Sequence, residues 1–201
     1  MKVELRAGQV RISGYVNATE KKSKPVLTPR GMVVEEVEPQ AFARALERAD
    51  NIELTVDHDP SRVYAQTADG TLTLYEDSIG LHADATIGDE RLAQLAREGR
   101  LRGWSFGMRN VVDELVPRKK ELPLRRIRAL DMDHITLVLN KRPVYSAMSL
   151  ELRSSEPVQV ETRAALGNVQ IAEIQPPFDN SAFRGRADAA KPTRRNAHEE
   201  S

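Results

Sequence analysis

Apolar and polar residues alternate in many short segments of the chain, with the two-residue period that is typical of half-buried β-strands. Residues 9–16 (QVRISGYV), 52–56 (IELTV) and 80–87 (GLHADATI) show this period, and residues 31–37 (GMVVEEV) have a similar pattern. The turn sequences ADG and EDSIG divide residues 62–87, which predicts two or three strands there. The first half of the chain is therefore expected to be rich in short strands.

Two segments have helical spacing instead. One follows Pro39, which suits a first helical turn, and places Phe42 and Leu46 on a single apolar face. The other runs from Asp89, a good N-cap, to Gly99, a good terminator. Each pattern predicts a short amphipathic helix.

Strand-like patterns return within residues 101–117 (LRGWSFGMRNVVDELVP), 124–140 (LRRIRALDMDHITLVLN) and 146–153 (SAMSLELR). Many short strands with two short helices predict a mainly β fold of the α+β class. We expect an antiparallel β-barrel with helices packed around it, formed by one domain over residues 1–153.

The composition changes from Ser154 to the end of the chain, where Pro, Ala, Asn, Ser and charged residues dominate. Residues 154–201 are therefore expected to form a flexible, largely disordered C-terminal tail. Apolar residues between Val169 and Phe178 indicate a short docking segment within this tail.

Charge and composition exclude several classes of function. Lys plus Arg and Asp plus Glu number 30 each, so the net charge is zero and directs the protein neither to nucleic acid nor to an anionic membrane. No signal peptide or transmembrane run is visible, which predicts a cytoplasmic location. Because the chain has no cysteine, a nucleophile must be an oxygen or a lysine.

Residues 103–107, GWSFG, satisfy the G-x-S-x-G pattern of the α/β-hydrolase nucleophile elbow. In those enzymes the serine follows a strand and precedes a helix. Here the predicted helix ends at Gly99, ahead of Ser105, and a strand-like segment follows the serine. This order excludes the α/β-hydrolase fold, and it leaves Ser105 as either a nucleophile or part of a tight turn beside Trp104.

A serine nucleophile needs a neighbouring base, and histidine has the suitable pKa. Among the four histidines, His198 lies in the predicted tail and His82 lies in mid-strand, where a surface or barrel-wall position is expected. His58 lies just past a strand end with an aspartate on each side, and His134 lies within DMDHITLV. These two are the candidate bases; the alternatives are an ordinary strand-end residue, a core histidine, or ligands of a metal site.

Several segments together resemble one known family. They are GYV, VEPQAFARAL, LTVDHDPSRVYAQ, DSIGLHADATI, REGRLRGWSFGMR and MDHITLVLNKRPVYSAMSLELR, spread over most of the first 153 residues. In this order and spacing they resemble the prohead (capsid maturation) serine proteases of tailed bacteriophages, which are related in fold to the herpesvirus assemblins. The resemblance implies a β-barrel of that type.

The resemblance also implies which residues carry the chemistry. His58 matches the catalytic histidine of the family and Ser105 matches its nucleophile, whereas His134 stands where the family has a glutamate. Either His134 orients His58, as in the Ser-His-His arrangement of the assemblins, or Asp133 or Asp131 supplies a carboxylate. Because side chains alternate along a strand, Asp133 and His134 are expected on opposite faces, and we favour His134.

Support for the oxyanion is expected from two sources. Gly103 and Gly107 allow close backbone approach beside the serine, so that backbone N–H groups could be the donors. Arg125 and Arg126 are candidates because an arginine pair serves this purpose in the assemblins, although the same residues are compatible with a solvated strand face.

The function implied by the resemblance is a serine endopeptidase, without metal or cofactor, that processes the major capsid protein, the scaffold and itself during procapsid maturation. It would act inside the assembling procapsid in the host cytoplasm, and its tail would dock to capsid or scaffold protein and later be removed. The assemblin likeness suggests a homodimer. The alternative is a catalytically silent assembly module on the same fold.

Overall fold

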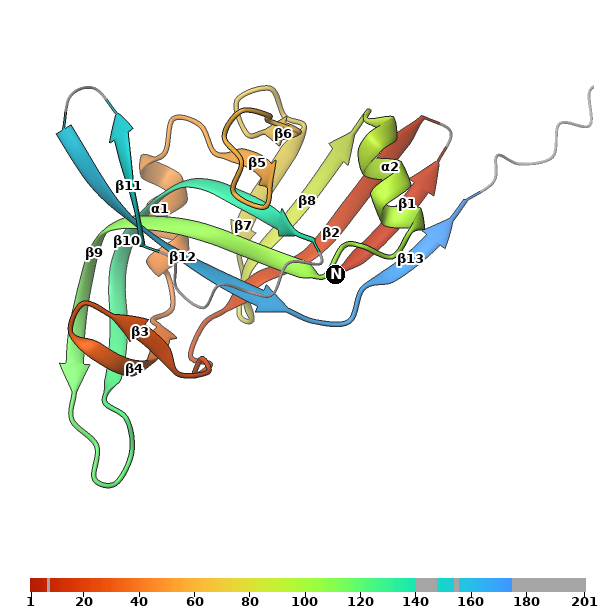
Figure 1. Cartoon of the computed structure of the whole chain (residues 1–201). Helices are drawn as coiled ribbons and strands as arrows, with labels where there is room; N and C mark the ends of the chain where they lie inside the picture. The colour runs from red at the N-terminus through yellow and green to blue at the C-terminus, as the bar shows by residue number, and fades with distance from the viewer. Residues whose placement is uncertain (7, 140–147, 154–155, 175–201) are drawn as a thin grey trace, which may run out of the picture.

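The computed structural model describes residues 1–6, 8–139, 148–153 and 156–174. In chain order the elements are β1 (Lys2–Arg6), β2 (Gln9–Ala18), β3 (Val26–Thr28), β4 (Gly31–Val37), α1 (Ala41–Arg48), β5 (Glu53–Val56), β6 (Ala65–Gln66), β7 (Leu72–Glu76), β8 (Gly80–Ile87), α2 (Glu90–Arg97), β9 (Gly103–Val116), β10 (Leu124–Val138), β11 (Met148–Arg153), β12 (Glu156–Leu166) and β13 (Gln170–Glu173). The predicted α+β class, mainly strands with two short helices, is confirmed (Figure 1).

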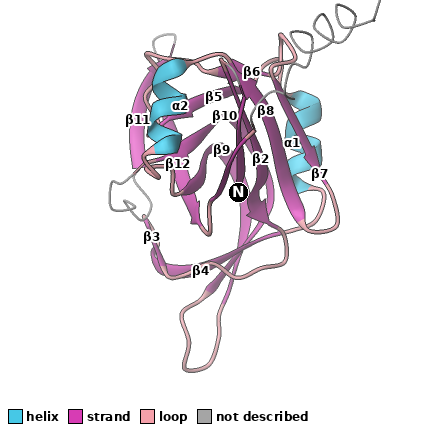
Figure 2. Cartoon of the chain, turned by 90° about the vertical axis from the view of Figure 1, so that its right-hand side faces the viewer, coloured by secondary structure: helices cyan, strands magenta, loops and turns pink. Residues whose placement is uncertain are grey.

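The strands form two sheets. One has the order β13-β1-β2-β8-β7 and the other β11-β12-β9-β10-β4-β3, with β5 pairing β10 off this path and β6 pairing β5. Most neighbours are antiparallel, but β1/β13, β10/β4 and β10/β5 are parallel. The two helices lie on opposite sides of the strands (Figure 2).

The expected closed barrel is not found among the described strands. A barrel requires hydrogen bonds between the first and last strands of one sheet. Here the ladders end at β13 and β7 in one sheet and at β11 and β3 in the other, and β9 instead packs across β2 of the other sheet. Trp104 of β9 lies in this contact, where a Cβ added at Gly14 of β2 would lie 3.5 Å from the indole nitrogen.

Both predicted helices are present, and their apolar faces are buried. Asp89 caps α2 by accepting a hydrogen bond of 2.7 Å from the backbone N–H of Leu92. The N-terminus of α1 is satisfied differently, because Glu76 on β7 accepts from the backbone N–H groups of Gln40 and Ala43 at 2.6 and 2.7 Å. Only the first of these caps is local in sequence and could be expected from it.

The apolar core is continuous with the strand that carries Ser105. All residues from Gly103 to Met108 are buried, including Trp104 and Phe106, whereas exposed positions recur in the second half of β9. Phe106 packs edge-on against Phe42 of α1 with ring centroids 5.4 Å apart. The first half of β9 is thus a central strand of the molecule.

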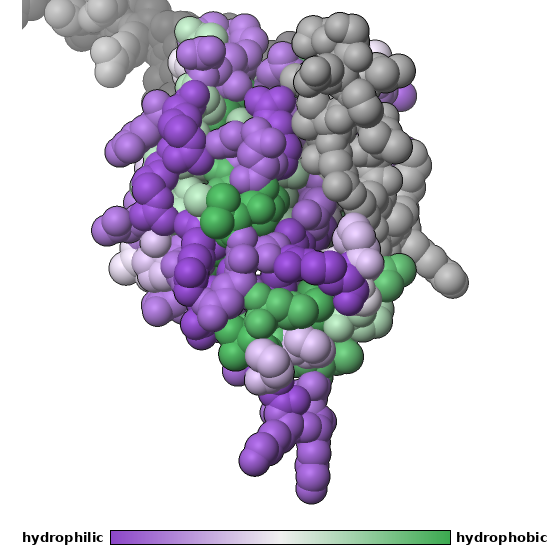
Figure 3. Space-filling view, turned by 90° about the vertical axis from the view of Figure 1, so that its left-hand side faces the viewer, coloured by the Kyte–Doolittle hydropathy of each residue, from purple (hydrophilic) through white to green (hydrophobic). Residues whose placement is uncertain are grey.

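Exposed apolar side chains gather at the opposite end of β9. They include Val112 and Leu115 of β9 together with Leu27 and Met32, a cross-strand pair of β3 and β4. Figure 3 shows apolar surface in the lower part of this face, with hydrophilic residues over most of the rest. This apolar surface is therefore separated from Ser105 by the length of the bent strand.

The chain beyond the predicted domain end differs from the expectation for part of its length. Residues 156–166 form β12, which pairs with β9, and residues 170–173 form β13, which pairs with β1. β12 also pairs with β11, which lies close to it in the chain, but β9 and β1 are more than 50 residues away from their partners, so the local composition gave no sign of these two pairings. Residues 175–201, and with them the end of the expected docking segment, lie outside the described residues.

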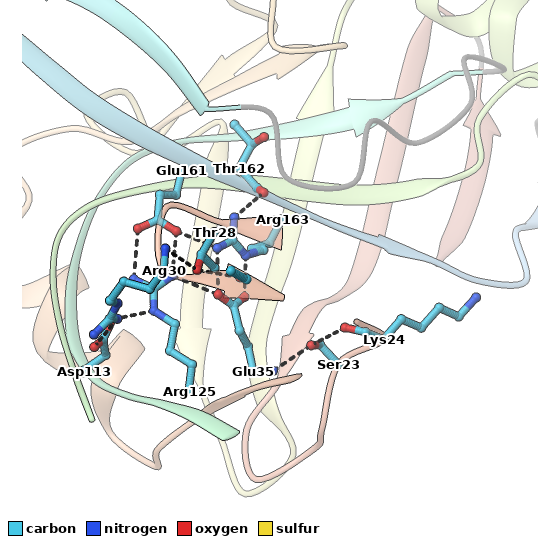
Figure 4. Close-up of polar contacts among 11 residues, drawn as sticks. Ser23, Lys24, Thr28, Arg30, Glu35, Asp113, Arg125, Glu161, Thr162 and Arg163 are labelled. Carbon is cyan, nitrogen blue, oxygen red and sulfur yellow. Dashed lines mark hydrogen bonds and ion pairs between the residues drawn. The ribbon is translucent and has the colours of Figure 1, made fainter. Parts of the chain in front are cut away.

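A cluster of charged side chains fastens β12 to the body (Figure 4). Arg125 of β10 donates two hydrogen bonds to Glu161 of β12, at 2.6 and 2.9 Å, and also pairs with Glu35 and Asp113. Arg163 of β12 pairs with Glu35 and Glu161. These five side chains are at most 14% exposed, so each charge depends on its partners in place of water.

Candidate active site

Three side chains from two strands and a turn meet in one chain of hydrogen bonds. Ser105 lies on β9, His58 lies in the turn after β5, and His134 lies on β10. The Ser105 Oγ is 2.8 Å from His58 Nε2, and His58 Nδ1 is 2.8 Å from His134 Nε2. The structure therefore brings together all three residues that the sequence singled out.

The position of His58 depends on a strained turn that β10 holds in place. Asp57 and His58 have φ angles of 51° and 59°, a left-handed conformation that costs non-glycine residues about 1–3 kcal/mol each. The N–H of His58 donates to the Thr136 hydroxyl at 3.0 Å, and the N–H of Asp57 donates to the Leu137 carbonyl at 2.9 Å. The Asp57 carboxylate also accepts from the N–H of Leu139 at 3.0 Å. These bonds offset the strain and fix the ring.

The position of His134 depends on a β-bulge. The ladder between β9 and β10 pairs Met132 with Met108 and then Ile135 with Phe106, so three steps on β10 span two on β9. Gly107 alone therefore faces two residues of β10. A bulge of this kind interrupts the strict alternation of side chains.

The two residues in the bulge are Asp133 and His134, and their side chains contact each other. His134 Nδ1 lies 2.8 Å from Asp133 Oδ1, and both side chains are buried. This differs from the expected placement on opposite faces, because the bulge breaks the two-residue period at this point. His134 and Asp133 are thus arranged in series and are not rivals for one position.

Gly107 leaves the space that the His134 ring occupies. A Cβ built at Gly107 would lie 2.3 Å from His134 Cε1 and 2.9 Å from both ring nitrogens. Any other residue at this position would push the ring away from its place. Gly107, the second glycine of the G-x-S-x-G pattern, is therefore required because the His134 ring fills the space beside it.

The environment of His58 keeps its ring neutral. The pKa of His58 is lowered to about 4. Burial is the largest cause and repulsion from His134 the second, while Asp57 raises the pKa by a smaller amount. At neutral pH the ring is therefore uncharged, and one of its nitrogens can accept a proton.

The hydrogen-bond chain has one consistent direction. A carboxylate only accepts, so His134 Nδ1–H donates to Asp133, which leaves His134 Nε2 to accept from His58 Nδ1–H. His58 Nε2 is then the acceptor for the Ser105 hydroxyl. This is the arrangement that activates a serine for attack on a carbonyl carbon.

The comparison with known families agrees with this chemistry. Residues 1–162 match the model of a family described as caudovirus prohead serine protease. The chain belongs to this family. No curated protein and no solved structure matches the chain. The resemblance to phage prohead proteases predicted from the sequence is therefore confirmed.

Of the remaining candidate residues of this prohead protease family member, Gly103 lies near Ser105 and the two arginines lie far along β10 from it. Gly103 begins β9 opposite Val138, next to the serine. In the ladder of β9 and β10, Arg125 lies opposite Leu115, whereas Thr136 lies opposite Ser105. Arg125 is therefore eleven positions from Thr136, a separation on the order of 30 Å along the strand. Arg125 is committed to the buried charge cluster, and its neighbour faces other carboxylates, since Arg126 lies 3.6 Å from Glu36. Both guanidinium groups thus face carboxylates at the far end of β10 from Thr136.

Asp131 does not join the hydrogen-bonded chain, because its carboxylate accepts from Arg48 and Asn110. Within the described ranges, no group of three or more His, Cys, Asp or Glu side chains is arranged to hold a metal ion. Sequence reasoning missed Thr136, whose hydroxyl fixes the turn of His58, and Arg109, whose guanidinium lies 3.5 Å from Asp133 Oδ2. Both lie in segments quoted above, Arg109 at the end of REGRLRGWSFGMR and Thr136 in DMDHITLV, but no local pattern shows which side chains they contact.

Gly107→Ala tests whether the position of the His134 ring depends on the absence of a side chain at residue 107. The added methyl group displaces the His134 ring, and a misplacement of this size costs on the order of 10²-fold in reactivity. The measurement is the labelling rate of Ser105 by a fluorophosphonate, with the melting temperature recorded in parallel. Gly88→Ala is the matched control, because a Cβ there meets nothing within 4 Å. Equal labelling of both variants would contradict the role given to Gly107.

Proposed function

We propose that this chain is a serine endopeptidase of procapsid maturation, with Ser105 as nucleophile, His58 as general base and His134 as the third member of the triad. The observation that carries the proposal is the unbroken hydrogen-bond chain from Ser105 Oγ through His58 to His134, with both distances at 2.8 Å. The family match over residues 1–162 supports it independently.

The mechanism follows from the direction of the hydrogen bonds. His58 Nε2 takes the proton of Ser105 as Oγ attacks the carbonyl carbon of a peptide bond. When the C–N bond breaks, His58 returns this proton to the leaving amine, and an acyl-enzyme remains. Water then attacks the ester with His58 again as base, which releases the second product and restores Ser105.

His134 and Asp133 act on His58 and do not touch the substrate. The imidazolium of His58 formed in the transition state donates through Nδ1 to His134 Nε2. A neutral imidazole stabilises this cation less well than a carboxylate does. The charge of Asp133, one hydrogen bond further along, compensates for part of this difference.

The substrates proposed are the major capsid protein, the scaffold and the chain's own C-terminal tail, processed inside the assembling procapsid in the host cytoplasm. The family description supports the capsid role in general terms. No helix of the described residues is long and apolar enough to cross a membrane. A homodimer stays a prediction from the assemblin likeness, and sedimentation velocity would test it.

A silent assembly module on the same fold is the alternative. Such a module has no need for a serine and a neutral histidine at hydrogen-bond distance. Nor does it need the strained turn at Asp57 and His58, which costs stability. Both features favour an enzyme, since strain of this kind is retained where the chemistry requires it.

Co-expression with the major capsid protein of the same phage tests the function. Ser105→Ala and His58→Ala are expected to abolish cleavage, because each removes an atom that forms or receives a bond in the reaction. His134→Ala should slow cleavage by about 10–10²-fold without abolishing it. Mass spectrometry of capsid protein, scaffold and protease gives the cleavage sites, and His82→Ala serves as control. Capsid processing that survives Ser105→Ala would refute the proposal.

The pH dependence of kcat/KM on a peptide substrate gives a second test. His58 must be neutral to accept the proton, so activity is present above its pKa and lost below it. Because this pKa is lowered to about 4, the acid limb should fall near that value and well below the ordinary histidine pKa. A limb at pH 6.5 or higher, about the value of an exposed histidine, would contradict the buried base. Circular dichroism at each pH checks that the protein is folded.

Asp133→Asn tests the direction of the hydrogen-bond chain. The guanidinium of Arg109 beside Oδ2 would hold the amide oxygen, so that the amide NH₂ faces His134 Nδ1. The chain would then reverse, and His58 Nε2 would carry a proton in place of a lone pair. We expect kcat to fall by on the order of 10²-fold or more, and by less in Asp133→Ala.

Nitrogen-15 shifts of the His58 ring report the tautomer directly. The matched control is Asp131→Asn, two positions away on the same strand and outside the chain of hydrogen bonds, with kcat expected within about twofold of the parent. An unchanged tautomer and kcat in Asp133→Asn would limit Asp133 to a packing role.

A further inference from the structure

The strand β12 covers the edge of β9 next to the nucleophile. Residues 161–166 pair antiparallel with residues 108–103 without a register shift, and Ala164 lies directly opposite Ser105. On the other side, Thr136 of β10 is the partner of Ser105. Figure 1 shows β12 running along β9. Ser105 therefore has a sheet neighbour on both sides.

The burial of Ser105 conflicts with its proposed reaction. Ser105 is only 1% exposed, although its hydroxyl is oriented toward a neutral base. A peptide carbonyl must come within about 3–3.5 Å of Oγ for attack, which requires an open path to this atom. The described state is thus chemically prepared but closed to a substrate.

We propose that β12 occupies the site at which an extended peptide substrate binds, and that its release from β9 converts a latent enzyme into an active one. This rests on the serine endopeptidase function proposed above. A peptide chain binds readily at a sheet edge by adding a strand, because main-chain N–H and C=O groups supply the affinity. With β12 released, residues 103–108 offer these groups beside the nucleophile.

The register supports a strand that stands in for substrate. Residues directly opposite each other in a sheet place their side chains on the same face. Ala164 therefore shares the face of Ser105, and a substrate in the same register would bring its own chain to this position. Binding of β12 and binding of substrate exclude each other in this arrangement.

The attachment of β12 to the body is polar. Of its side chains from 161 to 165, none belongs to the apolar core of the described structure. Besides the ladder, this part of the strand is held by ion pairs of Glu161 with Arg125 and of Arg163 with Glu35. Release of residues 161–165 therefore removes no side chain of this segment from the apolar core.

The charges of the cluster also remain balanced when β12 leaves. The strand contributes one negative and one positive side chain, Glu161 and Arg163. The body keeps Arg125, which pairs with both Glu35 and Asp113, and Arg30, which also pairs with Asp113. Two positive and two negative groups stay together, so no uncompensated charge remains buried.

Two release variants test the proposal. Glu161→Gln combined with Arg163→Gln removes the ion pairs of β12 and leaves the body neutral, and Ala164→Pro disrupts the strand opposite Ser105 without touching the cluster. Ala172→Pro in β13, which pairs with β1, is the matched control. Observed reactivity scales with the fraction of open molecules, and we expect fluorophosphonate labelling of Ser105 to rise about tenfold or more in the release variants only.

Addition of the β12 segment as a separate peptide tests the reverse step, the covering of β9. A synthetic peptide of residues 156–168 should inhibit the double variant competitively, raising KM for a capsid-derived peptide and leaving kcat unchanged. Hydrogen exchange of the backbone amides of residues 103–108, measured in a Ser105→Ala background, should increase on release and return to the protected level with the peptide.

The readouts separate the two proposals. Folded release variants that label no faster than the parent and keep these amides protected would make β12 a permanent strand and overturn the inference. Amides that respond as expected, with Ser105 unlabelled in every variant, would uphold β12 as a removable cover but refute the proposed function.

Discussion

One extra residue in β10 opposite Gly107 determines the geometry of the candidate site. A regular strand would direct Asp133 and His134 to opposite faces, and the carboxylate would then be out of reach of the ring. The bulge places both on one side, and the missing side chain of Gly107 leaves room for the imidazole. The serine, both rings and the carboxylate form one line only because these two features coincide.

The same strand also holds the base. Beyond the bulge, Thr136 and Leu137 of β10 bind the left-handed turn that carries His58, so both histidines take their positions from one stretch of β10. At its other end, β10 contributes Arg125 to the cluster that fastens β12. A single strand thus connects the chemistry of the site with the covering of its substrate edge.

The sequence predicted what depends on local patterns. The two helices, the cap at Asp89 and the position of His58 at a strand end follow from spacing and residue type. The roles of His58, Ser105 and His134 followed from the family resemblance. Contacts between distant segments were not predictable in this way: Glu76 caps α1 from another strand, and β12 has a composition typical of a flexible tail yet pairs with β9. Asp133 was misplaced because a bulge leaves no mark in a two-residue pattern. The barrel was wrongly expected for a similar reason: local patterns do not show which strands lie at the edges of the two described sheets.

The parallel pairing of β5 with β10 determines when the candidate site can assemble during synthesis of the chain. The turn of His58 is stabilised by Thr136, 78 residues further along the chain, and pairings between such distant segments form late in folding. Before β10 has been synthesised, the chain contains Ser105 and His58 but neither His134 nor the Thr136 hydroxyl that accepts from the N–H of His58. The hydrogen-bonded line of serine, histidines and carboxylate therefore cannot form before β10 has been synthesised and paired with β5.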